Sequence, residues 1–378
     1  MPTDGAKPRA AYIYDDAMSR HVLRDGHPMR PMRLHHTAAL LRAYGAFDDP
    51  AALLVEPRPA TPDELATFHT MEYVEAVRKL SSGDAASASR FGFSDQGDNP
   101  VFGGMYEAAL LYTGASVMAA ELVADGTVRV AFSPAGGLHH AMAAQASGFC
   151  VFNDPVVAIN VLRRRGLRVA YVDIDAHHGD GVQAAFYGDT DVLTISMHES
   201  GRWLFPGTGQ VREAGEGDAA GYSVNLPLFP YTDDDVFLEA FDAVVPPLVK
   251  AFAPDVLATQ LGVDTYVTDP LTHLALTTHG YIAAVQRLGA LGYPWLAFGG
   301  GGYDLDAVAR CWTMAYGVML GREWPDELPE GVGEYLTSKR LRDDVPVPDL
   351  SVQARARRFT QDQVDELRRT IFPLHGMS

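Results

Sequence analysis

The segment "VAYVDIDAHHGDG", residues 169–181, places five ionisable side chains within eight positions directly after an apolar run. They are Asp173, Asp175, His177, His178 and Asp180. So many ionisable groups at the end of a buried strand would repel or desolvate one another unless something organises them. Because carboxylates and imidazoles bind metal ions, the segment predicts a metal site.

Asp175 and His177 are the first candidate ligands. Side chains alternate along an extended chain, so residues 173, 175 and 177 are expected on one side of it. Asp264, also expected at a strand end, is the candidate third ligand. Two carboxylates and one imidazole, with an open position for water, suit a catalytic Zn²⁺ or Fe²⁺ ion. The alternative is a capped helix start with exposed histidines, which the additional strand-end aspartate disfavours.

A tandem pair of histidines, His139-His140, lies in "GGLHHAM". Tandem histidines are usually ordinary loop residues. However, Asp173 and Asp180 remain without a role if Asp175 binds the metal. Two histidines and two spare carboxylates predict two Asp–His pairs, in which each carboxylate fixes a tautomer and raises the basicity of the ring. Such pairs would perform acid–base catalysis beside a metal-activated water.

The glycine-rich segment "AFGGGGYD", residues 297–304, does not have the spacing of a dinucleotide-binding or phosphate-binding loop. Its glycines would let the backbone approach a ligand closely and bring Tyr303 into the site. A tyrosine hydroxyl there could donate a hydrogen bond to an oxyanion. The alternative is a buried tyrosine with a purely structural role.

The elements around these segments predict an α/β fold with a doubly wound, mostly parallel sheet. Short apolar runs without alternation favour strands that are covered on both faces. These runs lie near residue 11 and at 128–132, 167–174, 191–197, 255–263 and 294–298, and helical patterns lie at 154–166 and 233–252. Ligands bind beyond the carboxyl ends of such strands, so the four polar segments that follow the strands should converge on one face.

The composition narrows the classes of partner. The 378 residues are 47% hydrophobic and 21% charged, which is typical of a globular protein, and the formal net charge is −18. This charge disfavours nucleic acids and anionic membranes as partners and would suit a cationic substrate. The two cysteines form no Cys-x-x-Cys pair, and we expect neither a signal peptide nor an apolar run long enough to cross a bilayer. A cytoplasmic location is therefore expected.

Seven motifs give the chain a family resemblance. Between Tyr12 and Gly321 they read, in order, "GHPMRPMR", "PAGGLHHA", "GFCVFND", "YVDIDAHHGDGVQAAFY", "FPGTG", "QLGVDTYVTDP" and "GGGGYDLDAVARCW". The sequence resembles the histone deacetylase superfamily, which has the arginase-like fold, and within it the bacterial acetoin-utilisation deacetylases. The resemblance implies a single deacetylase domain over residues 1–378, with a core of about 10–321 and peripheral helices and loops at about 322–378.

The resemblance also implies roles for the residues already singled out. The metal ligands would be Asp175, His177 and Asp264. His140, paired with Asp180, would be the general base and then the general acid. His139, paired with Asp173, would tune the electrostatics, and Tyr303 would donate a hydrogen bond to the substrate carbonyl.

Further residues are assigned by the resemblance alone. The acyl-lysine tunnel would use Gly148, Phe149 and Phe205, with Leu271 and Asp98 at its rim and Arg33 near the inner cavity where acetate leaves. One monovalent cation, K⁺ or Na⁺, would be bound by Asp173, Asp175, His177, Ser196 and Met197. A second would be bound by Phe186, Asp189, Val192 and Tyr222.

The implied activity is hydrolysis of N6-acetyl-lysine in proteins, and an acetylated acyl-CoA synthetase is one expected substrate. Eukaryotic class I members bind inositol phosphate through basic residues near positions 270 and 306, where this chain has Pro270 and Asp306, so no inositol phosphate is expected. The alternatives are an acetylpolyamine deacetylase and a non-catalytic acyl-lysine reader. An arginase-type ureohydrolase is disfavoured because it requires more carboxylates.

Overall fold

Eight parallel strands form the centre of the computed structural model, which describes residues 8–84, 87–334, 336–344 and 350–377. Their order across the sheet is β2-β1-β3-β8-β7-β4-β5-β6. The strands are β1 (Ala10–Ile13), β2 (Ala52–Val55), β3 (Val130–Ser133), β4 (Val169–Asp173), β5 (Val192–Glu199), β6 (Ser223–Leu228), β7 (Val256–Gln260) and β8 (Trp295–Phe298). The predicted α/β class with a parallel sheet is confirmed.

Six of these strands were predicted from apolar runs, and every residue in them is buried. Strands β2 and β6, which the sequence did not reveal, form the two edges of the sheet. Strand β2 is only partly buried, whereas the sequence of β6, "SVNLPL", contains polar residues and a proline although all its residues are buried.

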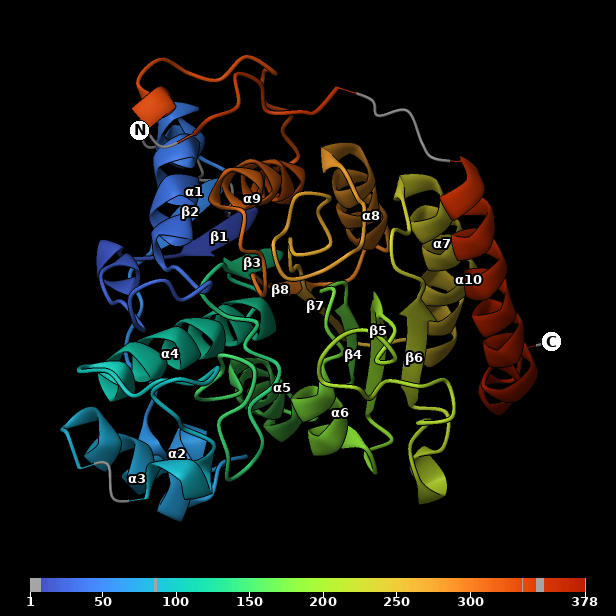
Figure 1. The fold of residues 1–378 in the computed structure, drawn as a ribbon, viewed down its shortest axis with the longest axis horizontal. Coiled ribbons are helices and arrows are strands. Elements are labelled where there is room, and N and C mark those ends of the chain that lie inside the picture. Colours follow the sequence, from blue (N-terminus) through green and yellow to red (C-terminus); the bar gives the residue numbers. More distant parts are fainter. Residues whose placement is uncertain (1–7, 85–86, 335, 345–349, 378) are drawn as a thin grey trace, which may run out of the picture.

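Helices cover both faces of the sheet (Figure 1). One face carries α1, α9, α8 and α7, and the other carries α4, α5 and α6. The helices are α1 (Met32–Ala43), α2 (Pro62–Leu65), α3 (Met71–Ser81), α4 (Met105–Ala124), α5 (Asp154–Arg164), α6 (Asp180–Phe186), α7 (Asp234–Phe252), α8 (Thr278–Ala290), α9 (Leu305–Leu320) and α10 (Leu350–Thr370). The predicted helices at 154–166 and 233–252 are α5 and α7. Side chains of Asn153 and Asp233 cap their first turns.

One helix among the described residues, α4, has the length and apolar composition of a membrane span. We expected no apolar segment long enough to cross a bilayer, and by length and composition α4 contradicts that expectation. Half of its apolar window is buried inside the protein, where α4 packs against α5 and β3. This packing is the ordinary reason for an apolar helix in a folded core.

The C-terminal segment completes the core. Helix α10 packs against α7 and β6 and lies beyond β6 at that end of the sheet (Figure 1). Four apolar side chains from its second half and the following turn join the main hydrophobic cluster: Val364, Leu367, Ile371 and Phe372. The predicted peripheral helix is present, but it is integral to the core.

Candidate active site

The candidate site lies at the carboxyl ends of four neighbouring strands, β3, β8, β7 and β4. The segments that follow these strands carry the tandem histidines, Tyr303, Asp264 and the cluster that begins at Asp175. Parallel strands end on one side of the sheet, so the four segments meet there, as the sequence predicted.

The three predicted metal ligands form one buried cluster. One ligand atom from each of Asp175, His177 and Asp264 lies within 4.8 Å of the other two. His177 Nδ1 is 2.9 Å from Asp264 Oδ2 and 3.1 Å from Asp175 Oδ1. The chain bends here instead of remaining extended, because the His177 N–H donates to Asp175 Oδ1 at 2.9 Å. The prediction that residues 173, 175 and 177 lie on one side of an extended chain is therefore wrong. Asp173 does not join the cluster and contacts His139 instead.

The remaining carboxylate oxygens of the cluster are held by other groups. Asp175 Oδ2 accepts from Gln260 Nε2 at 2.6 Å and from the Gly301 N–H at 2.7 Å. Asp264 Oδ1 accepts from the Ala176 N–H at 2.8 Å. Asp175 Oδ1, Asp264 Oδ2 and His177 Nδ1 are therefore left facing one another. Two buried carboxylates with one imidazole fit a divalent cation such as Zn²⁺ or Fe²⁺, and the outer contacts orient the ligands.

Close packing explains the glycine at position 301. A Cβ atom there would lie 2.2 Å from Asp264 Oδ2 and 2.8 Å from Asp175 Oδ2. Any other residue would push the carboxylates apart. The glycine-rich segment thus admits the backbone to the ligand cluster, and Tyr303 follows two residues later.

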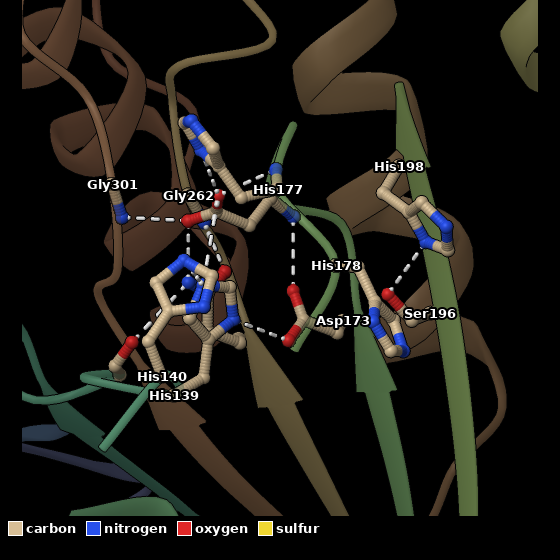
Figure 2. Close-up of polar contacts among 12 residues, drawn as sticks. His139, His140, Asp173, His177, His178, Ser196, His198, Gly262 and Gly301 are labelled. Carbon is tan, nitrogen blue, oxygen red and sulfur yellow. Dashed lines mark hydrogen bonds and ion pairs between the residues drawn. The ribbon is translucent and has the colours of Figure 1, made fainter. Parts of the chain in front are cut away.

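The two expected Asp–His pairs are present as contacts. His139 Nδ1 lies 2.8 Å from Asp173 Oδ2, and His140 Nδ1 lies 2.7 Å from Asp180 Oδ1. Figure 2 shows the two rings side by side, next to His177. Because an ionised carboxylate only accepts, each Nδ1 carries a hydrogen and each Nε2 is directed elsewhere. Tyr171 also donates to Asp173, at 2.7 Å, which fixes that carboxylate further.

The environments of the two histidines separate their proton affinities. Burial lowers the pKa of His140 to about 4, and the charge of His139 acts in the same direction. Burial also opposes charge on His139, but Asp173 and Asp175 outweigh it and raise the pKa of His139 to about 9. These shifts favour a neutral His140 ring, whose Nε2 can accept a proton, beside a positively charged His139 ring.

Phe205 lies beside His140, and Phe149 lies beside Tyr303. The ring of Phe205 is centred 5.1 Å from the His140 ring, and that of Phe149 lies 5.7 Å from the Tyr303 ring. Gly148 packs so closely that a Cβ there would lie 2.4 Å from His140 Cδ2. These residues, predicted as tunnel walls, are brought together.

One buried carboxylate, that of Asp269, connects Tyr303 to the rim. Asp269 accepts from the N–H groups of Tyr303 at 2.8 Å and Leu271 at 2.9 Å. Burial raises the pKa of the Tyr303 hydroxyl well above its ordinary value, and Asp264 acts in the same direction. Tyr303 is therefore a neutral hydroxyl donor.

Arg33 and Asp98 both lie near Phe149, by different routes. Arg33 is buried, donates to the Gly302 carbonyl at 2.9 Å and lines a cavity of about 50 Å³ together with Phe149. Asp98 is exposed, and its carbonyl oxygen lies 3.1 Å from His27 Nε2. The centroids of the His27 and Phe149 rings are 4.7 Å apart, so the His27 ring links Asp98 to Phe149.

The residues expected to bind monovalent cations fall in two places. Asp173 is paired with Ser196 across β4 and β5, and Met197 follows. Ser196 Oγ lies 2.9 Å from His198 Nδ1, and both residues are visible in Figure 2. Phe186, Asp189 and Val192 lie together between α6 and β5, where the Asp189 N–H donates to the Phe186 carbonyl at 3.0 Å.

The fourth residue of the second cation group, Tyr222, lies at the start of β6. Its carbonyl accepts from the Thr194 N–H at 2.9 Å. The carboxylate of Asp189, another member of that group, already faces the Arg163 guanidinium at 3.4 Å.

Several polar residues behind the site were not predicted. Asp154 accepts from the N–H groups of Gly137 at 3.0 Å and Leu138 at 2.9 Å, directly before the tandem histidines. Asn153 donates to the His139 carbonyl at 3.2 Å and, through its own N–H, to His69 Nε2 at 2.9 Å. "FND" in the sequence was visible only as part of a family motif. Nothing in its spacing indicated which groups it would hold.

Comparison with known proteins agrees with this arrangement. A family model described as histone deacetylase domain matches residues 27–319. The chain is 41% identical over 331 residues to acetoin utilization protein AcuC of Bacillus subtilis, covering 84% of this chain and 85% of that protein. It is 38% identical over 330 residues to histone deacetylase 3 of rice, covering 86% of this chain but only 64% of that longer protein.

Solved structures show the same fold. The crystal structure of an HDAC homolog from Aquifex aeolicus superposes with a TM-score of 0.87 at 30% identity and covers 95% of this chain and 99% of its own. An HDAC homolog complexed with SAHA superposes equally well, at 31% identity. The match of fold, domain and sequence over most of the chain supports a hydrolase with deacetylase activity, and the protein belongs to the histone deacetylase domain family.

Proposed function

We propose that the protein hydrolyses the acetyl amide of N6-acetyl-lysine in proteins and releases acetate in a metal-dependent reaction. The observation that carries the proposal is the buried Asp175–His177–Asp264 cluster beside two Asp–His pairs. A divalent cation held by these three residues, Zn²⁺ or Fe²⁺, would polarise the amide carbonyl and make water a stronger acid.

The side chains of the chain divide the remaining work. His140, unprotonated and oriented by Asp180, takes a proton from the attacking water and delivers it to the departing lysine amine. Tyr303 donates a hydrogen bond to the oxyanion that develops on the former carbonyl oxygen. The positive charge on His139 stabilises the negative charge that develops on the oxyanion, and Asp173 orients the His139 ring. Arg33 lies near the cavity through which acetate would leave.

The walls of the site favour an aliphatic tether. Phe149 and Phe205 would contact the lysine methylenes, with Gly148 against His140 and with Leu271 and Asp98 at the rim. Such walls make apolar contact without reading a sequence, so an acetylated protein is a suitable substrate, for example an acyl-CoA synthetase. K⁺ or Na⁺ at the two groups described above would have a structural role.

The surroundings of Asp306 support the absence of an inositol phosphate. Its carboxylate accepts from Ser338 Oγ at 2.6 Å and from the N–H groups of Thr337 and Ser338 at 2.8 and 2.9 Å. A position that is basic in class I enzymes thus binds the chain's own C-terminal segment. We further propose a cytoplasmic enzyme with one domain over residues 1–378 and no nucleic acid or membrane partner, which is consistent with the net charge of −18.

The net charge also favours a second candidate, deacetylation of an acetylated polyamine. Both candidates use the same catalytic groups, so only the substrate distinguishes them.

The test is acetate release by purified protein after chelation and after Zn²⁺ or Fe²⁺ is added back. An acetyl-lysine peptide and acetylspermidine are compared at equal concentration, with His140→Ala as the control for contaminating activity. Metal-dependent turnover that favours the peptide supports the proposal. Turnover of acetylspermidine alone supports the acetylpolyamine deacetylase instead. If the metal-loaded protein hydrolyses neither substrate, both candidate functions are contradicted.

A further inference from the structure

Three aromatic rings pack together beside the proposed tunnel entrance. The centroids of Trp203 and Phe229 are 5.2 Å apart, and Phe359 lies 5.7 Å from each of them. Phe359 belongs to α10, so the cluster joins the loop after β5, the end of β6 and the C-terminal helix. Trp203 remains 44% exposed although it is packed on one side.

Two arginines border this cluster. The Arg202 guanidinium lies 5.9 Å from the centroid of the Phe359 ring, and that of Arg355 lies 5.3 Å from the Phe229 ring. Both arginines are exposed, and within the part of the chain that the structure describes neither forms an ion pair with a carboxylate. By contrast, Arg357 on the same helix pairs with Glu239. The two arginines are therefore available on a protein whose net charge is −18.

The cluster is continuous with the entrance along two stretches of chain. On one side, Trp203 is two residues before Phe205, whose ring contacts His140. On the other side, the ring of Tyr231 is 6.0 Å from that of His273, two residues after the rim residue Leu271. The Tyr231 N–H also donates to the His273 carbonyl at 2.6 Å. These links place the aromatic cluster next to the segments that carry the proposed tunnel and rim residues.

Tyr231 is held in an unusual conformation at this place. Its φ of 65° is left-handed, which is uncommon and unfavourable for a residue with a bulky side chain. Gln353 of α10 donates to its carbonyl at 2.9 Å and helps to hold it there. The ring nevertheless remains 53% exposed. Strained backbone conformations of this kind cluster at functional sites.

We propose that Trp203, Phe229, Tyr231 and Phe359, with Arg202 and Arg355, bind the polypeptide that flanks the acetyl-lysine, and that they prefer an apolar residue next to acidic residues. This inference rests on the proposed function. Tryptophan, tyrosine and arginine are the residue types that dominate binding energy at protein interfaces. Two exposed aromatic side chains, Trp203 and Tyr231, beside the half-buried Phe229 and Phe359 are typical of an interaction site. The two arginines, which have no carboxylate partner among the described residues, would attract carboxylates and repel polyamines.

A neighbouring hollow supports the acidic preference. It has a volume of about 160 Å³, lies between the loop 200–212 and α10, and is lined by Arg202 and Arg212. Ser200 and Gln363 add neutral polar groups, whereas Glu366 contributes one negative charge. Two arginines against one glutamate leave a positive lining that suits a carboxylate side chain.

The test compares three substrates with metal-loaded enzyme: a blocked acetyl-lysine monomer, a peptide with Phe and Asp beside the acetyl-lysine, and the same peptide with Lys in place of Asp. The wild type should turn over the acidic peptide with a kcat/KM about ten-fold higher than the basic one. In Trp203→Ala the ratio of kcat/KM for the acidic peptide to that for the monomer should fall about ten-fold, chiefly through KM. The double variant Arg202→Glu/Arg355→Glu should favour the basic peptide.

Two controls match these changes in type but lie elsewhere. Leu374→Ala removes an apolar side chain that is 55% exposed near the amino end of β6, and Arg165→Glu reverses the charge of an arginine paired with Asp125. Binding of the acidic peptide to inactive His140→Ala, with and without Trp203→Ala, provides a second readout.

The outcomes separate the two proposals. Equal turnover of acidic and basic peptides by the wild type would overturn the inference and leave the deacetylase proposal intact. So would variants that reduce monomer and peptide turnover by the same factor. If the metal-loaded wild type cleaves neither monomer nor peptide, the proposed function fails, and the inference fails with it.

Discussion

The Nε2 atoms of His139 and His140 lie 3.1 Å apart, so one ring can donate a proton to the other in a hydrogen bond. Both Nδ1 atoms already donate to aspartates, which leaves Nε2 as the only variable position on each ring. The pKa of about 9 for His139 and of about 4 for His140 places that proton on His139. The two rings therefore differ in proton affinity, and they are not interchangeable.

Replacing the two histidines singly should reveal this difference. We expect His140→Ala to lower kcat by about 10²–10⁴, which is the usual contribution of a general base. His139→Ala should cost less, because it removes a charge and not the proton acceptor. The measurement is steady-state kcat with metal content determined for each variant, and His375→Ala, in the C-terminal turn beside Gly221, is the control. Equal losses in both variants would contradict the assignment of the base.

Metal affinity should depend on Gln260, which touches no metal-facing atom. Its amide donates to Asp175 Oδ2 at 2.6 Å and leaves Oδ1 for the cation. Removing such an orienting contact typically weakens metal binding by about 10–100-fold, so we expect that loss in Gln260→Ala. Chelator competition followed by metal analysis measures it directly. Gln361→Ala, an exposed change on α10, should leave the affinity unaltered.

Tyr303→Phe should separate catalysis from binding. The loss of one oxyanion donor lowers kcat by about 10²–10³, while KM and metal content should stay close to their wild-type values. Tyr106→Phe, on α4, is the matched control for loss of a tyrosine hydroxyl. If Tyr303→Phe retained wild-type kcat, the hydroxyl would have no part in the reaction.

Acid should destabilise the fold through His69. Burial lowers the pKa of His69 to about 4, below the ordinary value of 6.5, so the folded state binds fewer protons than the unfolded state between these values. Stability from this group is present above pH 6.5 and is lost as the pH falls toward 4. At pH 5 the loss is about 2 kcal/mol relative to pH 7.

Urea denaturation of the wild type and His69→Gln at both pH values measures this loss. The glutamine variant should be less stable at pH 7, but its decrease between pH 7 and pH 5 should be smaller by about 2 kcal/mol. The half-buried His375→Gln should retain the full decrease. An identical pH dependence in wild type and His69→Gln would exclude His69 as its source.

The C-terminal segment should contribute to stability through Asp343. Its carboxylate contacts the guanidinium of Arg310 at 2.7 Å and accepts from the Tyr266 hydroxyl and the Thr278 N–H, both at 2.8 Å. The Arg310 side chain is only 4% exposed. Removing a partner of a buried charge is costly, so Asp343→Ala should lower the free energy of unfolding by about 2–4 kcal/mol.

The next residue is a natural control for this prediction. Asp344 is 98% exposed and lies 3.6 Å from Arg340, and Asp344→Ala should change stability by less than about 0.5 kcal/mol. Urea denaturation of both variants tests the difference. Similar effects from the two substitutions would show that the ion pair with Arg310 is not what stabilises this segment.

The sequence predicted the central strands because they are apolar on both faces, and it predicted the site because ionisable residues follow those strands. It did not reveal β6, where Asn225 is buried but satisfied by contacts with Gln183 and with the Glu213 carbonyl, 42 and 12 residues away. Because such partners are distant in sequence, a polar residue that is buried in the fold is predicted from the sequence to be exposed. Strand β2 escaped notice because it is four residues long and half exposed.

The same limit applies within the site. The residues that face the cluster were recognisable by type, whereas those that orient them were not. Gln260, Asp154 and Asp269 each act on backbone or side-chain atoms that only the folded topology brings near. The bend at residues 175–177 depends on a hydrogen bond from the His177 N–H to the Asp175 carboxylate. The alternation of side chains along a strand gives no sign of such a bond.

The position of α10 has a consequence for how the protein is made. Strand β6 is an edge of the sheet, and the helix that packs against it is the last long element of the chain. During synthesis that edge emerges more than a hundred residues before its cover, and an uncovered strand invites pairing with other chains. A chain that ended after α9 would contain every residue of the candidate active site but would leave β6 without α10, and such a product is expected to aggregate.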